Sequence, residues 1–237
     1  MPPMPNVATL PSEAEGDAGR PSNAERAYRS LKNLILGNEL PAGSQLLEQE
    51  AAERLGMSRT PVREAMVRLK EDGMVEIRPR HGMRVLPVSS ADMREIYEVL
   101  TALESAAAEM VARRGASPTE LANLRAAVAD MEEALGRDDL DGWAAADKRF
   151  HWLLVTLAGN ERLQQTVSQL GEQAHRARVL TLRLRPKPTN SIRDHARLVA
   201  AIARRDAEGA RKIHHDHRTK AGEMLVDLLD RLGLKQV

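Results

Sequence analysis

The sequence contains no cysteine, and only 2% of its residues are aromatic. The lack of cysteine excludes disulfide bonds and thiolate metal ligands, so any metal must be held by His, Asp or Glu. The shortage of aromatic residues leaves the core to aliphatic side chains and methionine, and Ala and Leu are the strongest helix formers. We therefore expect a mainly helical protein.

Long apolar segments are missing as well. No apolar run approaches the roughly 20 residues that span a bilayer, and the N-terminus lacks the basic and apolar regions of a secretion signal. We therefore expect a cytoplasmic protein that does not contact membranes. The chain has 237 residues and a formal net charge of +1, so any surface that binds nucleic acid must be a local basic patch. The length suits one large domain or two ordinary ones.

The start of the chain predicts a tail followed by three short helices. Residues 1–21 are rich in Pro, Gly, Ala and acidic residues without periodicity, which predicts a disordered tail. Apolar residues then repeat at helical spacing over Asn23–Leu36 and again over Glu48–Leu55. A third helix is predicted with Thr60 as its N-cap and Pro61 as its first helical residue.

After the third helix the apolar pattern changes to a period of two. The segments Val75–Arg78 and Met83–Leu86 alternate in this way, and Pro79–Gly82 joins them, which predicts a β-hairpin. Three short helices followed by a hairpin are the order of a winged helix-turn-helix. We assign residues 22–88 to this domain and residues 89–237, which are helical in pattern throughout, to an all-α bundle.

The start of the third helix carries side chains suited to DNA. Arg59 and Arg63 lie away from its apolar stripe, and arginine can donate two hydrogen bonds to guanine O6 and N7 in a major groove. The hydroxyls of Ser58 and Thr60 suit phosphate oxygens. Basic residues on a helix are more often a solvated face, but their place in the second helix of a helix-turn-helix favours DNA contact.

The predicted hairpin tip adds a second set of DNA-binding residues. Arg80 and His81 favour phosphate or the minor groove, and Gly82 would allow the backbone to approach the duplex closely.

The helical part carries a candidate metal site. Asp147 and His151 are four residues apart, so they point about 40° apart on a helix. His195 lies in the penultimate predicted helix and His217 in the last one. One carboxylate and three imidazoles suit a divalent metal such as Zn²⁺, Mn²⁺ or Ni²⁺, and ligands in bundles converge from facing helices.

The alternative is that these residues are scattered surface or core-edge histidines. The chain has seven histidines, and the last helix alone carries His214, His215 and His217. Helical periodicity does not decide which of these three histidines faces the interior of the bundle.

The N-terminal part, residues 26–88, resembles the GntR family of bacterial regulators. The resemblance rests on the segment Leu55-Gly56-Met57-Ser58-Arg59-Thr60-Pro61-Val62-Arg63-Glu64-Ala65-Met66, and on Gly37, Leu40, Pro41, Gly43, Leu46, Leu69, Asp72-Gly73 and Arg80-His81-Gly82. It implies that Arg59, Thr60, Arg63 and His81-Gly82 occupy operator-contacting positions. Gln49 stands where some members have a contacting arginine, which implies a weaker contact or a different base there.

Residues 91–230 resemble the FCD-type ligand-binding domain of the FadR subfamily. The resemblance rests on Asp147-x-x-x-His151, Ala158-Gly159-Asn160, Leu163, Asp194-His195, Ile202 and His217. It implies that a divalent metal, with Zn²⁺ as the first choice, is held by Asp147, His151, His195 and by His217 rather than His214 or His215. The metal in such proteins usually helps to hold a small carboxylate effector.

One departure concerns the binding of a carboxylate. Many carboxylate-binding members have an arginine shortly before a Leu-Glu pair in the first helix of this domain, whereas this chain has Leu100 and Thr101 before Leu103-Glu104. Three other arginines are candidates for the missing clamp, although we expect all of them to be exposed: Arg176, Arg178 and Arg183. We expect Trp152 to be packed inside the bundle.

These features together predict a metabolite-responsive transcriptional repressor that binds a palindromic operator as a homodimer. One alternative is a metal-dependent hydrolase that has kept a DNA-binding domain, because Asp and three His can activate water. No further Glu or His is recognisably placed as its general base. Another alternative is a regulator with a purely structural metal, which responds to a protein partner or to the metal itself.

Overall fold

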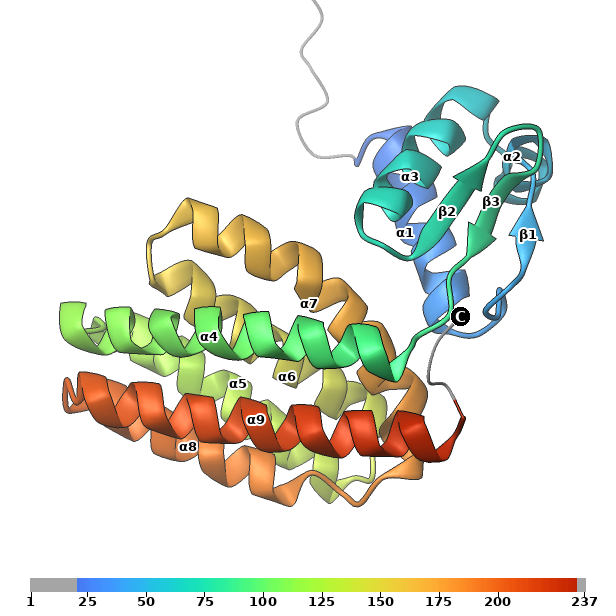
Figure 1. Cartoon of the computed structure of the whole chain (residues 1–237). Helices are drawn as coiled ribbons and strands as arrows, with labels where there is room; N and C mark the ends of the chain where they lie inside the picture. The colour runs from blue at the N-terminus through green and yellow to red at the C-terminus, as the bar shows by residue number, and fades with distance from the viewer. Residues whose placement is uncertain (1–20, 234–237) are drawn as a thin grey trace, which may run out of the picture.

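The computed structural model describes residues 21–233, which form a small N-terminal unit and a larger helical bundle (Figure 1). The predicted fold class, a winged helix-turn-helix followed by an all-α bundle, is confirmed. Most of the predicted tail, residues 1–20, lies outside the described residues. The N-terminal unit consists of α1 (Asn23–Leu36), β1 (Gln45–Leu46), α2 (Glu48–Leu55), α3 (Arg59–Glu71), β2 (Val75–Arg78) and β3 (Gly82–Val85).

The third helix, α3, begins earlier than the sequence predicts. Ser58, with extended backbone angles, is its N-cap, so Thr60 lies inside the first turn and is not the cap. Pro61 is tolerated at the third helical position because the first four N–H groups of a helix have no partner within it. Burial on α3 follows the expected stripe of Val62, Met66 and Leu69, which pack with α1 in the core of the N-terminal unit.

The wing contains one more strand than the hairpin pattern predicts. β3 pairs with β2 in antiparallel register, with Ile77 opposite Met83, and β1 pairs with the other edge of β3. Because β1 has only two residues, it is too short to give a recognisable alternation. It nevertheless fixes the start of α2 against the wing.

The bundle begins at Ser90 and contains only helices within the described residues. These are α4 (Ser90–Arg114), α5 (Pro118–Gly136), α6 (Leu140–Leu157), α7 (Glu161–Thr181), the short 3₁₀ helix η1 (Leu182–Leu184), α8 (Thr189–Ala203) and α9 (Ala207–Arg231). The long helices α4 and α9 lie side by side (Figure 1). Their close approach needs Gly222, since a Cβ there would lie 2.8 Å from the ring of Tyr97.

Two apolar clusters fill the bundle, one around Phe150 and Met131 and the other around Leu100 and Leu225. Helix α7 borders the N-terminal unit and packs against α1 (Figure 1).

Candidate metal centre and nucleic-acid surface

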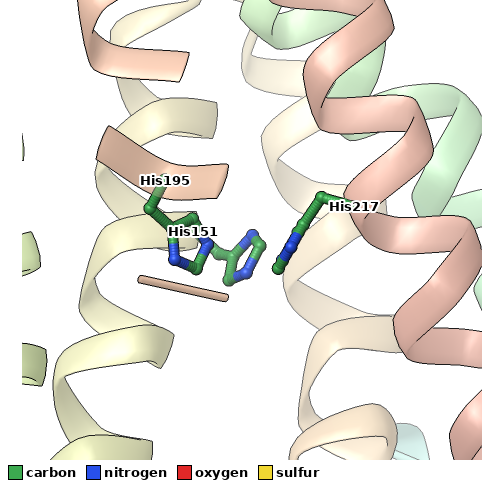
Figure 2. Close-up of side chains that lie close together, drawn as sticks. All are labelled: His151, His195 and His217. Atoms are coloured by element: carbon green, nitrogen blue, oxygen red, sulfur yellow. The ribbon is translucent and has the colours of Figure 1, made fainter. Parts of the chain in front are cut away.

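The four predicted metal ligands come together in the interior of the bundle. Asp147 and His151 lie on α6, His195 lies on α8 and His217 on α9, and all four are buried. Figure 2 shows the three histidine rings pointing toward one another from their separate helices. Each ring offers one nitrogen such that these nitrogens lie within 4.8 Å of one another.

The carboxylate of Asp147 completes this group of four residues, Asp147, His151, His195 and His217, which we call the histidine cluster. The Oδ1 atom of Asp147 lies 3.7 Å from Nε2 of His151 and 3.9 Å from Nε2 of His195. Both ring nitrogens of His195 are buried without any hydrogen-bond partner among the described residues. A buried polar group normally has such a partner, so His195 has the property expected of an imidazole that ligates an ion.

The charge states in the cluster suit a cation. Burial and the nearby His217 and His151 hold the pKa of His195 well below its usual value. Burial alone would raise the pKa of Asp147, but His151 and Arg178 outweigh it and hold that pKa well below the usual range. His195 is therefore a neutral imidazole and Asp147 an ionised carboxylate, which are the ligating forms of these groups. Burial would lower the pKa of His151, but Glu104 and Asp147 outweigh it and raise that pKa, so a cation bound here competes with a proton at His151.

A second buried network lies directly behind His151 and was not predicted from the sequence. Glu104 of α4 accepts a hydrogen bond from Nδ1 of His151 at 2.8 Å, lies 3.0 Å from Nε2 of His214, and pairs with Arg218 at 3.2 Å. Its carboxylate leaves Nε2 of His151 facing Asp147, which is how a carboxylate orients a ligating histidine. The Leu103-Glu104 pair was visible in the sequence, but only the fold reveals its partner.

His214 belongs to this network and not to the cluster. Burial lowers its pKa to about 4, although its hydrogen bond to Glu104 acts in the opposite direction. His215 is exposed. Of the three neighbouring histidines of α9, His217, the one that the resemblance implies, is the one whose ring nitrogen lies with those of His151 and His195.

A cavity of about 280 Å³ opens beside the cluster. Asp147, His151 and His217 form part of its wall, together with Arg178 and Arg185. Arg178 Nη1 lies 3.9 Å from Asp147 Oδ2. The Nε and Nη2 atoms of Arg185 are buried without hydrogen-bond partners among the described residues. The cavity thus combines the cluster with several cationic side chains, among them Arg178 and Arg185, which suits a small anion.

The burial of three side chains differs from the sequence-based expectation. Arg176 and Arg178 are buried, whereas only Arg183 is exposed as expected. Arg178 faces the interior of the bundle beside Asp147. Arg176 points about 200° away on α7 and lines a cavity between the N-terminal unit and the start of α4. A charge pattern alone does not show that both of these faces are covered. Trp152 is 54% exposed, so the expectation that it packs inside the bundle was wrong. It follows the inward-facing His151 by one position and therefore points about 100° away.

The predicted DNA-binding side chains lie on the surface of the N-terminal unit. Those of α3 and the wing tip, Ser58, Arg59, Thr60, Arg63, Arg80 and His81, are all exposed. Arg63 forms two hydrogen bonds to the Glu48 carboxylate at 3.0 and 2.8 Å, and Arg59 Nη2 lies 3.4 Å from the same group. Glu48, the first residue of α2, thus holds both guanidinium groups beside the start of α3.

The packing of the protein itself requires a glycine at position 82. Gly82 has a φ of +70°, and a Cβ there would lie 2.3 Å from the carbonyl oxygen of Leu46. The wing is therefore packed directly against the segment that leads into Glu48. This contact brings the tip end of the wing to the same short stretch of chain that, through Glu48, holds the arginines of α3.

The structure adds one finding on membranes: no helix within residues 21–233 is both long and apolar enough to cross a bilayer.

Comparisons with known proteins give the family of the chain. Residues 23–85 match the family model of bacterial regulatory proteins of the gntR family, and residues 95–220 match the FCD domain. A regulator in the TAR-I ttuE-ttuC' intergenic region of Agrobacterium vitis is 49% identical over 154 residues, which cover 64% of this chain and 88% of the relative. The transcriptional repressor RspR of Escherichia coli is 29% identical, with 84% and 87% of the two chains covered.

A solved structure supports the fold. The E. coli protein McbR/YncC superposes with a TM-score of 0.76 at 23% identity, covering 88% of this chain and 99% of its own. The matching families and relatives are regulators of transcription and not enzymes.

Proposed function

The chain belongs to the GntR family of bacterial transcriptional regulators and carries an FCD domain, and from this premise we propose that it is a metabolite-responsive repressor gated at the histidine cluster. As a member of this family it binds DNA and regulates transcription. The remaining elements of the proposal are the metal, the effector, and the dimer that binds a palindromic operator.

The metal is the element with the strongest support. The observation that carries it is the buried His195, whose two ring nitrogens have no partner among the described residues, beside Asp147, His151 and His217. These four residues would hold the ion, and zinc suits a set of imidazoles with one carboxylate. When bound, the ion supplies a positive centre that attracts a carboxylate oxygen. Glu104 orients His151 through its Nδ1 atom.

The effector is a small organic acid that enters the 280 Å³ cavity. Arg178 and Arg185 line this cavity and replace the arginine that Leu100 and Thr101 do not provide. Arg185 has two buried nitrogens without partners within residues 21–233, and leaving them unpaired is costly until an anion accepts their hydrogen bonds. The cavity also favours an effector site over a purely structural metal, since a structural site is closed by protein ligands.

The DNA contacts follow from the exposed residues of α3 and the wing. Arg59 and Arg63 read bases, Ser58 and Thr60 bind phosphate, and the wing contributes Arg80, His81 and the backbone at Gly82. A homodimer places two such units on the halves of a palindromic operator. Repression is the mode stated for the E. coli relative RspR, and cytoplasmic location follows from binding to the chromosome. A hydrolase has no support from the comparisons.

The test is the metal content of purified full-length protein. We expect about one equivalent of zinc per chain in the wild type, and its loss in His195→Ala. His215→Ala is the matched control, because His215 lies on the same helix as His217 but is exposed; this variant should keep its zinc. Full zinc in His195→Ala, or none in the wild type, would rule out the proposed ligand set. Mass spectrometry of small molecules released from the same samples would identify the acid.

A further inference from the structure

Helix α7 contacts both the histidine cluster and the recognition helix α3. Toward the cluster, Arg178 of α7 lies 3.9 Å from Asp147. Toward the N-terminal unit, Gln169 of α7 donates a hydrogen bond of 3.1 Å from Nε2 to the carbonyl oxygen of Glu71, the last residue of α3. The helix therefore extends from the candidate effector site to the end of the DNA-reading helix.

Glu172, between these two points, binds a lysine from each side. Its carboxylate lies 2.5 Å from Nζ of Lys32 on α1 and 2.8 Å from Nζ of Lys148 on α6. Lys32 and Glu172 are only 12% and 18% exposed, so solvent screens this pair less than an ordinary surface pair. Lys148 directly follows Asp147, so a displacement of that turn of α6 moves both residues together.

The contacts continue from Lys32 to α3. Lys32 Nζ donates a hydrogen bond of 3.0 Å to the hydroxyl of Tyr28, and this hydroxyl donates one of 2.6 Å to Asp72. Asp72 is the residue that follows α3 and caps it. A continuous series of polar contacts therefore connects α6, beside the cluster, with the end of α3.

We propose that Glu172 of α7 couples the histidine cluster to the recognition helix by holding Lys148 and Lys32 at once. This inference rests on the proposed metal site and adds to it the residue through which occupancy reaches the N-terminal unit. A ligand shifts the equilibrium between two placements of that unit only if it binds one of them more tightly. The Lys148–Glu172–Lys32 bridge supplies such a difference, because both of its ion pairs are formed in this placement of α1 and α6 and a displacement of either helix away from α7 lengthens one of them.

The experiment measures amide hydrogen exchange of α3 in full-length protein, with zinc bound and after removal of zinc by a chelator. In the wild type, zinc should slow exchange at the end of α3 by at least about fivefold, the lower range of allosteric coupling. In Glu172→Gln, which keeps the shape of the side chain but removes its charge, the effect of zinc should fall below about twofold. Zinc content should be unchanged, because Glu172 lies outside the predicted ligand set.

Two further variants make the result specific. Glu161→Gln is the control: it removes an exposed carboxylate from the same helix and should keep the full effect of zinc. Lys32→Met should lose the effect, and the double variant with Glu172→Gln should lose no more than either single one, because both remove the same link.

The outcomes separate the two proposals. Zinc-dependent protection of α3 that persists in Glu172→Gln, or that is absent from zinc-loaded wild type, would overturn the coupling role while leaving the metal site intact. A wild type that takes up no zinc would overturn both. Loss of protection in Glu161→Gln as well would show that any change in α7 breaks the connection, and would also overturn the specific role of Glu172.

Discussion

The partly buried side chain of His175 makes the stability of this protein depend on pH. The Nδ1 atom of His175 on α7 is buried without a hydrogen-bond partner among the described residues. Burial, assisted by Arg178 and Lys148, lowers the pKa of His175 to about 3. In the unfolded chain the same side chain titrates near 6.5. Between these values the unfolded state binds more protons than the folded state, so this contribution makes stability fall as the pH decreases from about 6.5.

The prediction is that His175→Gln reduces the acid sensitivity of the metal-free protein. Between pH 6 and pH 5, its free energy of unfolding should change by about 1 kcal/mol less per pH unit than that of the wild type. Urea denaturation of both proteins at each pH, in the presence of a chelator, measures the difference. His81→Gln, an exposed histidine at the wing tip, is the control and should leave the slope unchanged. If the free energy of unfolding changed equally with pH in wild type and in His175→Gln, the lowered pKa of His175 would be contradicted.

The individual side chains also show what the sequence could and could not predict. The spacing of Asp147 and His151 and the resemblance through His195 and His217 led to four residues that lie together. The roles of Glu104 and Arg185 could not be predicted, because each depends on a partner or a cavity formed by distant segments. A charge is costly to bury, so exposure was the natural expectation for Arg178, whose position beside Asp147 offsets that cost.

At the scale of elements, α2 and α3 form one unit in which Glu48 holds the two arginines of α3. The Arg63 guanidinium meets the Glu48 carboxylate through two hydrogen bonds. This arrangement fixes the guanidinium near the start of α3 before DNA is bound. A side chain fixed in this way loses less conformational entropy on binding.

Removal of this side chain should weaken operator binding and broaden base preference. We expect Arg63→Ala to bind its specific duplex roughly tenfold to a hundredfold less tightly and to lose discrimination at one position of each half-site. Selection of duplexes from a random library, followed by titration at fixed salt, measures both effects. Lys70→Ala removes an exposed charge from the other end of the same helix and should change affinity much less. If the two variants selected the same sequences with equal affinity, α3 would not be the reading helix.

Element prediction succeeded where the apolar pattern is long and failed where it is short. The helices α1 and α2 have the predicted bounds, because Gly37 and Gly56 follow their apolar stripes directly. Strand β1 was missed because its two residues carry no period. The start of α3 was placed too late because Ser58 and Thr60 are both good capping residues, and the sequence does not show which one has extended backbone angles.

At the scale of the whole molecule, the order of the two domains was predictable and their contact was not. The winged unit and the bundle each follow from their own patterns of apolar residues and turns. The contact between them depends on Lys32 and Glu172, which are far apart in the sequence and have no local signature. A charged residue in a sequence is usually interpreted as a solvated surface residue. Only the folded chain therefore shows that Lys32 and Glu172 are partners.

This division of the molecule leads to a prediction about heat stability. An ion that binds only the folded state stabilises it by about 2.7 kcal/mol at a free concentration of 100 times the Kd. For a chain of this size that corresponds to an increase of roughly 5–10 °C in Tm. Zinc should therefore raise the Tm of the bundle by this amount, and the increase should be absent in His195→Ala, because the cluster loses a ligand from α8.

Differential scanning calorimetry with zinc or with a chelator would measure this effect and reveal whether the N-terminal unit follows the bundle. The predicted ligands all lie on α6, α8 and α9, so the direct effect of zinc is confined to the bundle. The junction at Glu172 and Gln169 connects that bundle to α1 and α3. A single transition that shifts as a whole is expected from such a junction. Two transitions, of which only the later shifts with zinc, would mean that the units unfold independently and that the junction is too weak to couple them.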